Sequence, residues 1–186
     1  QRFSTWYNKA RWRYGTLWAE RFKSVLIEPK HHAVQTVAFY IDLNPVRAGL
    51  VKDPKDYRFC GYGEAVAGNL QARSGLRCLH GPGISWSEAQ AAHRLGLFGT
   101  GSEAREGACS FPVEAFEKVL AEKGRLPLAT VLRCRVRYFT DGAVLGSKAF
   151  VETHLADYRR NHGVRERTAP RPLVPITDWN GMTCMR

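Results

Sequence analysis

The clearest pattern of apolar and polar positions lies between residues 29 and 51, which read PKHHAVQTVAFYIDLNPVRAGLV. Apolar side chains recur there at the i, i+3, i+4 and i+7 spacing of one helical face, at Val34, Val37, Ala38 and Ile41. Pro45 lacks the amide hydrogen that a continuing helix needs, so the helix is expected to end at about Asn44. Tyr40 lies four residues before Asn44, which places both side chains on one side of this helix. Gly49 is expected to follow as a left-handed helix cap.

A second pattern, of alternating side chains, predicts a strand between Glu20 and Glu28. One face has Phe22, Ser24 and Leu26, and the other has Arg21, Lys23, Val25 and Ile27. The apolar run at residues 25–27 indicates burial on both faces at that end. One strand and one helix cannot close a core, so the strand is expected to need sheet partners.

The composition after residue 67 suggests how the chain is divided. Residues 68–84 are rich in glycine and polar side chains, which is typical of a linker. Helical periodicity returns beyond it, over residues 86–97, 111–123, 127–138 and 149–161, with Ser147 as a good N-cap of the last helix. We therefore predict an α+β protein, with part of one domain at residues 1–67, a linker at 68–84, a mainly helical domain at 85–163, and a tail or partner-binding strap at 164–186.

The two last helices suggest a DNA-binding unit. A helix, a short turn at Asp141-Gly142 and a capped helix follow one another, which is the pattern of a helix-turn-helix. Most antiparallel helix pairs bind nothing, so the charge nearby decides between packing and binding. Basic side chains are frequent here, and the candidate DNA contacts are Arg133, Arg135, Arg137, Lys148 and Arg159. They favour the DNA-binding interpretation.

The net charge supports a polyanionic partner. The chain has 28 lysines and arginines against 17 acidic residues, a formal net charge of +11, and a pI of about 9.8. Residues 1–66 have 11 basic and 6 acidic side chains, residues 125–171 have 10 and 4, and residues 67–124 have 6 of each. Two separate basic blocks favour two nucleic-acid surfaces over charge that serves only solubility.

Residues 1–18 interleave aromatic and basic side chains. Aromatic rings offer stacking platforms for unpaired bases and cations contact phosphates, but such rings also pack on sheets. Trp12 and Tyr14 fit both interpretations equally, whereas Phe3, Trp6 and Trp18 are expected in the core. The candidate DNA contacts in this half of the chain are Arg11, Arg13, Arg21, Lys23 and Arg47.

Tyr40 and Asn44 have two interpretations on spacing alone. A phenol and an amide oxygen at one helix end form either a nucleophile beside a metal ligand or a buried tyrosine beside a helix cap.

The sequence around this pair makes the interpretation more specific. GTLWAERFKSVLIE occupies residues 15–28, and YIDLNPVRAGLVKDPKDYRFCGYGEAV occupies residues 40–66. With these motifs in this order, residues 1 to about 67 resemble the REP-associated tyrosine transposases, of the HUH single-tyrosine transposase superfamily of insertion sequences. LRCRVRYFTDGAVLGSKAFVE at residues 132–152 is similar, less closely, to the C-terminal extension of one bacterial branch of that family.

The resemblance implies a partial ferredoxin-like HUH domain, in which the strand at residues 20–28 pairs with strands that come earlier in family members. Tyr40 matches the catalytic tyrosine and Asn44 matches a metal ligand. In the family, Mg2+ or Mn2+ assists the tyrosine as it attacks a phosphate of single-stranded or hairpin DNA, which leaves a phosphotyrosine link. A bacterial, cytoplasmic, nucleoid-associated protein is implied, and self-association is compatible with it.

The histidines depart from the family pattern. The family's His-hydrophobic-His strand has no counterpart, because His-x-His occurs nowhere in the sequence and His31 and His32 are adjacent. No metal is therefore firmly implied for this chain by itself. Three alternatives stay open: a tyrosine transposase whose histidines lie in a preceding segment, a catalytically inactive DNA-binding protein that arose by truncation or domestication, and a remnant without function.

Other classes of protein are disfavoured. The five cysteines are widely spaced and form no C-x-x-C pair, which favours reduced thiols over a disulfide framework or a zinc knuckle. The sequence has no Walker loop and no dinucleotide fingerprint, so no nucleotide cofactor is implied. No apolar run reaches the length of a membrane span, so no membrane partner is expected.

Overall fold

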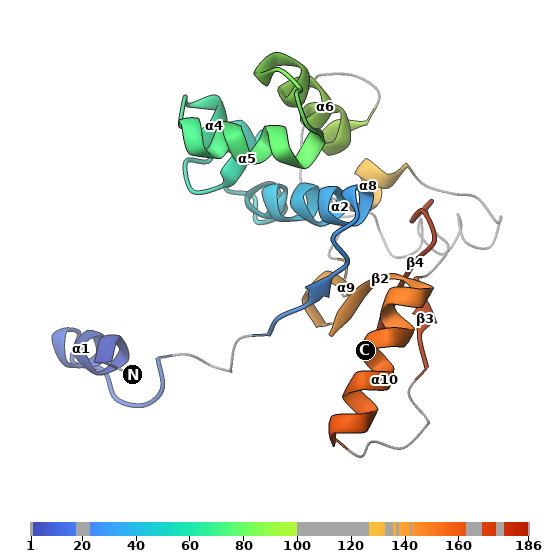
Figure 1. Ribbon diagram of the computed structural model, residues 1–186. Helices are drawn as coiled ribbons and strands as arrows, with labels where there is room; N and C mark the ends of the chain where they lie inside the picture. Colours follow the sequence, from blue (N-terminus) through green and yellow to red (C-terminus); the bar gives the residue numbers. More distant parts are fainter. Residues whose placement is uncertain are drawn as a thin grey trace, which may run out of the picture.

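The computed structural model describes residues 2–17, 23–99, 127–132, 136, 138–141, 143–162, 169–173 and 177–185. These residues form a mixed α+β protein, as predicted, with a helical layer beside a small sheet that carries one long helix (Figure 1). The helical layer consists of α2 (His31–Asp42), α3 (Asn44–Arg47), the 3-10 helix η1 (Pro54–Asp56), α4 (Gly61–Val66), α5 (Leu70–His80), α6 (Trp86–Phe98) and α8 (Leu128–Leu132). None of the described helices is long and apolar enough to cross a membrane.

The predicted helix with Tyr40 exists but is divided in two. α2 ends at Asp42, and α3 begins at Asn44 with Pro45 in its first turn, where a missing amide hydrogen costs nothing. Gly49 has φ 68°, and Leu50 N donates to Pro45 O at 2.9 Å. This is the glycine-capped helix end that the sequence predicted.

The buried face of α2 agrees only in part with the predicted one, since Val37 is buried and Ala38 is half-buried. Val34 is 37% exposed and Ile41 is 54% exposed, although both lie on the apolar stripe. The side chains that are buried include Ala33, Phe39 and Tyr40. α5 and α6 pack on α2, and residues of α8 and of the C-terminal strand join the same core. A helix covered on several sides no longer has a single apolar stripe, so the periodicity predicted only part of the buried surface.

The segment predicted as a linker contains α5. The side chain of Asn69 caps this helix and accepts hydrogen bonds from Gln71 N at 3.0 Å and Ala72 N at 3.1 Å. Leu76 is buried in the core. The glycine content was misleading because Gly68 and Gly81 flank the helix at positive φ.

The described strands form one sheet, which joins distant parts of the chain. Its strands are β1 (Leu26–Ile27), β2 (Val144–Ser147), β3 (Arg171–Pro172) and β4 (Met182–Met185), in the order β1-β2-β4-β3. β1 pairs with β2 in parallel, and the other pairs are antiparallel. The described part of the predicted strand is thus shorter than expected, and Leu26 is 48% exposed rather than buried. Its described partner, β2, comes from later in the chain.

The predicted tail also belongs to this sheet. Every residue of β4 is buried, and Trp179 just before it is 5% exposed. Part of the region expected as a tail or strap therefore contributes to the core.

The predicted helix-turn-helix has a different structure. The expected helix at 127–138 is α8 and the short α9 (Tyr138–Asp141), with Val136 outside both helices. β2 then separates α9 from α10 (Lys148–His162), so no tight turn joins the two helices. The expected cap is confirmed, because Ser147 Oγ accepts from Phe150 N at 3.3 Å. α10 packs on β2 and β4 through Val151 and Leu155.

Of the other predicted helices, α6 confirms the one at 86–97, with a capping box between Ser85 and Glu88. The helix predicted at 111–123 lies outside the described residues.

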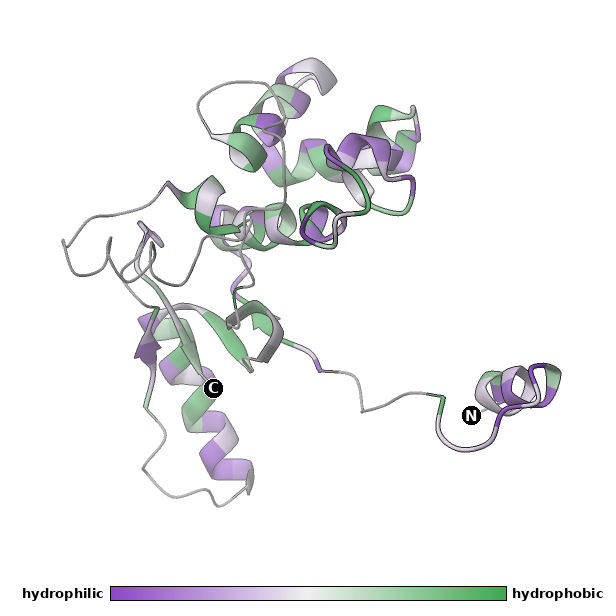
Figure 2. Cartoon of the chain, turned by 180° about the vertical axis from the view of Figure 1, so that it is seen from behind, coloured by the Kyte–Doolittle hydropathy of each residue, from purple (hydrophilic) through white to green (hydrophobic). Residues whose placement is uncertain are grey.

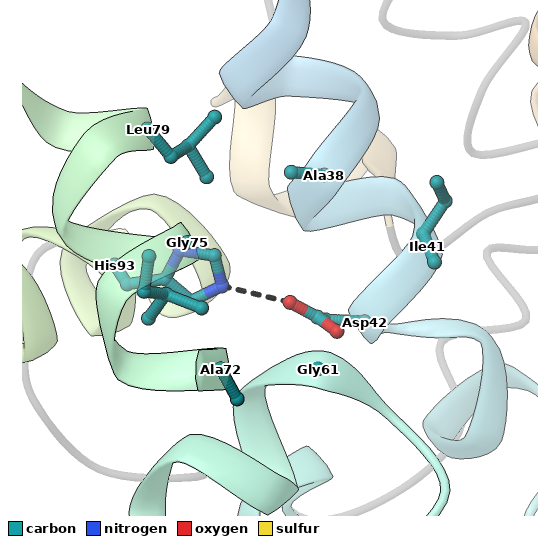
Figure 3. A pocket seen from close by; sticks show the side chains of 9 residues that line it. Ala38, Ile41, Asp42, Gly61, Ala72, Gly75, Leu79 and His93 are labelled. Carbon is teal, nitrogen blue, oxygen red and sulfur yellow. Dashed lines mark hydrogen bonds and ion pairs between the residues drawn. The ribbon is translucent and has the colours of Figure 1, made fainter. Parts of the chain in front are cut away.

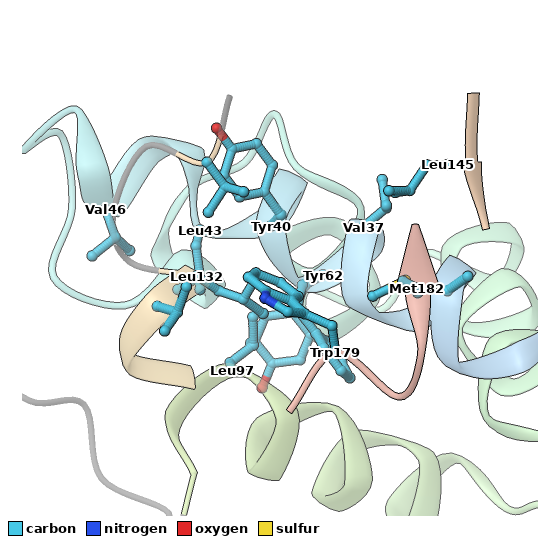
Figure 4. Packing of buried hydrophobic residues seen from close by; sticks show 14 of the residues in the cluster. Val37, Tyr40, Leu43, Val46, Tyr62, Leu97, Leu132, Leu145, Trp179 and Met182 are labelled. Carbon is cyan, nitrogen blue, oxygen red and sulfur yellow. The ribbon is translucent and has the colours of Figure 1, made fainter. Parts of the chain in front are cut away.

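Tyr40, Leu97, Leu132 and Trp179 meet in one core (Figure 4). Elements on both sides of the predicted boundary at residue 67 therefore share this core, and the domain division stays a prediction.

Candidate functional site

Tyr40 lies in the interior at the end of α2. The residue is 5% exposed, and the Phe139 ring meets its ring edge-on at a centroid distance of 4.8 Å. Its hydroxyl group points away from Tyr62 and Leu97 (Figure 4). The Arg47 guanidinium covers the ring, with Cζ 3.8 Å from the ring centroid.

The same guanidinium binds three oxygen atoms. Arg47 Nη1 donates to Leu132 O at 2.6 Å, and Nη2 donates to Tyr40 O at 2.7 Å and to Asn44 Oδ1. The spacing of three residues brings Arg47 to Asn44. We call Tyr40, Asn44, Arg47 and the Leu132 carbonyl the Arg47 cluster.

The Arg47 cluster does not fit a divalent metal as it is arranged. Asn44 Oδ1, the oxygen expected to bind the ion, accepts a hydrogen bond from a cation. Among the described residues, no group of three His, Cys, Asp or Glu side chains is placed to hold a metal. His31 and His32 lie in the first turn of α2, two turns or more before Tyr40.

The structure separates the predicted DNA contacts that it describes. Arg11 and Arg13 are exposed after α1 (Arg2–Ala10), and Lys23 is exposed before β1. Arg47 is directed inward, whereas Lys148 and Arg159 lie on α10, which is distant from α1 in Figure 1. Lys148 Nζ is 3.7 Å from Glu152 Oε1. The predicted contacts Arg21, Arg133, Arg135 and Arg137 lie outside the described residues.

The predictions for the aromatic residues were partly wrong. Phe3 is 56% exposed and Trp6 is 63% exposed, although both were expected in the core, and Trp18 lies outside the described residues. α1 buries none of its residues, because no described element packs on it (Figure 1). Phe59 is 72% exposed, whereas Tyr62 is fully buried.

A buried acid–base network was not anticipated from the sequence. Asp42 Oδ2 lies 2.9 Å from His93 Nε2 (Figure 3), and His93 Nδ1 lies 3.1 Å from His80 Nε2. Burial, and then the charge of His93, lowers the pKa of His80 from 6.5 to about 4. The sequence contained one indication that His93 is buried. Ala89, His93 and Leu97 are spaced four residues apart, so His93 lies on the apolar face of its helix.

A pocket of about 370 Å³ lies between α2 and α5 beside this network (Figure 3). Its lining is mainly apolar and includes Ala38, Ile41 and Leu79, with Asp42 and His93 at its base. His93 has no exposed surface, and its partners already satisfy it. The network therefore acts as a structural link between α2, α5 and α6.

A second buried carboxylate links β1 to β2. Glu28 accepts hydrogen bonds from Ser147 N at 2.6 Å and Ser147 Oγ at 3.0 Å, and Lys30 Nζ lies 2.9 Å away. Burial raises the pKa of Glu28, but these hydrogen bonds and the Lys30 charge outweigh it and lower the pKa below its ordinary value.

Cys60, Cys78 and Cys184 are free thiols, whereas Cys109 and Cys134 lie outside the described residues.

No protein-family model, curated protein sequence or solved structure gave a significant match to the chain.

Proposed function

We propose that this chain is a DNA-binding protein related to the REP-associated tyrosine transposases, and that it does not cut DNA in the arrangement described. The observation that carries the proposal is the Arg47 cluster. Arg47 covers the ring of Tyr40 and occupies the amide oxygen of Asn44, the two groups that cleavage would need.

The geometry of Tyr40 is unsuited to attack on a phosphate. A nucleophile must approach the phosphorus atom closely and in line, and the bulky phosphodiester must fit beside it. Tyr40 is only 5% exposed, with Phe139 and Arg47 against its ring. Arg47 is also poorly placed to anchor the phosphate, because its donors bind protein oxygens.

Charge supports the binding part of the proposal. The formal net charge of +11 favours association with a polyanion and makes its affinity strongly dependent on salt. Arg11, Arg13 and Lys148 are exposed, so phosphates can reach them.

Active transposition is the second candidate function, and one observation favours it. Tyr40 and Asn44 contact the same side chain, Arg47, so the residues matched to the family motif form one local unit. Activity would require Arg47 to release Asn44 and a preceding segment to supply further metal ligands.

One experiment tests both parts of the proposal. The full chain is incubated with labelled single-stranded hairpin DNA and Mn2+, and binding and covalent adducts are measured on native and denaturing gels. We expect salt-dependent binding without an adduct, and Tyr40→Phe should bind as the wild type does.

Two results would contradict the proposal. An adduct that forms with the wild-type chain and disappears in Tyr40→Phe would show that the chain is an active enzyme. Absence of binding at low salt would show that DNA is not its partner.

A further inference from the structure

We propose that residues 2–17, here called the N-terminal arm, form a binding surface for unpaired bases of single-stranded nucleic acid. This inference rests on the proposed DNA binding and specifies which strand form the arm recognises. Trp12 and Tyr14 would stack on bases, while Arg11 and Arg13 on either side of Trp12 contact phosphates.

The aromatic side chains of the arm are directed to solvent. Trp12 is 90% exposed and Tyr14 is 97% exposed. On α1, the Phe3 ring lies near two others, with centroid distances of 5.8 Å to Trp6 and 6.0 Å to Tyr7. No described element covers them, and α1 stands apart from the other elements in both views (Figures 1 and 2). The rings therefore contribute little to the core that the described residues form.

The loop that presents Trp12 and Tyr14 has a defined shape. Arg13 N donates to Asn8 O at 2.9 Å, and Asn8 Nδ2 donates to Gly15 O at 2.8 Å. These hydrogen bonds fold residues 11–15 back against the end of α1. Trp12 adopts a left-handed backbone, φ 52°, which is unfavourable for a bulky residue. A strained conformation that exposes a large ring does not serve packing and is a feature of binding sites.

Charge identifies the partner. Residues 1–19 contain Arg2, Lys9, Arg11 and Arg13 and no acidic residue. Each of the two exposed rings in the loop has an arginine next to it in sequence. This combination of aromatic faces and cations is the one that binds single strands, whose bases expose the flat faces that a duplex hides.

A membrane surface fits the arm less well. Amphipathic helices at membranes separate a broad apolar face from a basic face along their length. In the arm, the two most exposed rings lie beyond the helix and alternate with arginines. Single-stranded nucleic acid is therefore the better match.

The test compares strand forms with the full chain. Fluorescence anisotropy at fixed salt gives Kd for oligothymidylate of about 15 nucleotides and for a duplex of the same length. In the double variant Trp12→Ala/Tyr14→Ala, we expect the affinity for the single strand to fall about tenfold or more, because stacking on each base is lost. The affinity for the duplex should stay within about twofold, since the cations of the arm remain.

Two control variants test whether the loss of affinity comes from the aromatic faces and whether it is specific to the arm. Trp12→Phe/Tyr14→Phe keeps the aromatic faces and should retain most of the single-strand affinity. Phe59→Ala removes another exposed ring beside an arginine, 72% exposed with Arg58 Cζ 4.8 Å from its centroid, and should leave single-strand affinity unchanged.

Three results would contradict the inference, and each leads to a different conclusion. If the Trp12→Ala/Tyr14→Ala variant binds single strands as the wild type does, the arm is not the site, although DNA binding stands. If it instead loses binding to vesicles of anionic phospholipid with single-strand affinity unchanged, the arm binds membranes. If the wild type binds neither DNA form, the proposed function and this inference both fail.

Discussion

Two regions of the molecule combine aromatic rings with arginines and use them in opposite ways. In the Arg47 cluster, the guanidinium lies over a buried tyrosine and donates to Leu132 O, Tyr40 O and Asn44 Oδ1. In the N-terminal arm, Trp12 and Tyr14 are almost fully exposed, and Arg13 lies between them in the sequence. The same residue types stabilise the fold in the first region and are available for binding in the second.

The comparison shows that residue type does not assign a role by itself. Arg47 and Arg11 were both candidate DNA contacts, but Arg11 is exposed, whereas Arg47 is half-buried and donates to Leu132 O. The substitutions below test whether the interior around α2 is structural while the arm is not.

The largest effect is expected at the buried pair in the helical layer. Asp42→Ala leaves His93, which has no exposed surface, without its carboxylate partner. We expect the free energy of unfolding to fall by about 3–5 kcal/mol, because His93 and Tyr62 N both lose a buried hydrogen-bond partner. Urea denaturation measures the change, and Trp12→Ala in the arm should cost no more than about 0.5 kcal/mol. Equal losses of stability in the two variants would show that Trp12 is as important for the fold as Asp42.

A smaller effect is expected at Arg47. Arg47→Ala leaves the Leu132 and Tyr40 carbonyls without this donor and uncovers the Tyr40 ring. We expect a loss of about 2–3 kcal/mol in the free energy of unfolding, because carbonyls that lose a partner bear a desolvation cost. Arg11→Ala is the matched control, and it should change stability by less than about 0.5 kcal/mol but weaken DNA binding. If the Arg47→Ala variant is as stable as the wild type but binds DNA less tightly, Arg47 belongs to the DNA-binding surface and not to the structural interior.

The smallest effect concerns pH and His80. Its pKa is lowered from 6.5 to about 4, so between these values the unfolded state binds a proton that the folded state does not. Stability is therefore complete above about pH 6.5 and falls as the pH drops toward 4, by on the order of 1 kcal/mol from this partly exposed group. His80→Gln should show a flatter profile over this range in urea denaturation. Parallel profiles for variant and wild type would contradict the assignment to His80.

Local patterns predicted several elements correctly. The helices at α2, α6 and α10 were expected, and so were the Gly49 cap and the Ser147 cap. These features depend on groups within a few residues of one another, and the sequence shows those groups directly. The same reasoning failed for α5, because glycines at its two ends resembled a linker.

The site was predictable only in part. The sequence placed Tyr40 near Asn44 and a basic residue after them, and the structure brings all three together. It did not indicate that Arg47 would turn inward, because one of its acceptors, Leu132 O, lies 85 residues away. The link from Asp42 to His93 spans 51 residues and was missed for the same reason.

The sequence by itself determined the charge of the chain, the existence and caps of its main helices, and the aromatic and basic composition of the arm. Only the tertiary structure decided which residues of α2 are buried, that β1 pairs with β2, and that Arg47 donates to Leu132 O while Trp12 is exposed. The physical reason is the separation in sequence between the residues that interact. Helix formation and capping depend on neighbouring residues, whereas burial and hydrogen-bond partners depend on which distant segments pack together, and that information is absent from a local period.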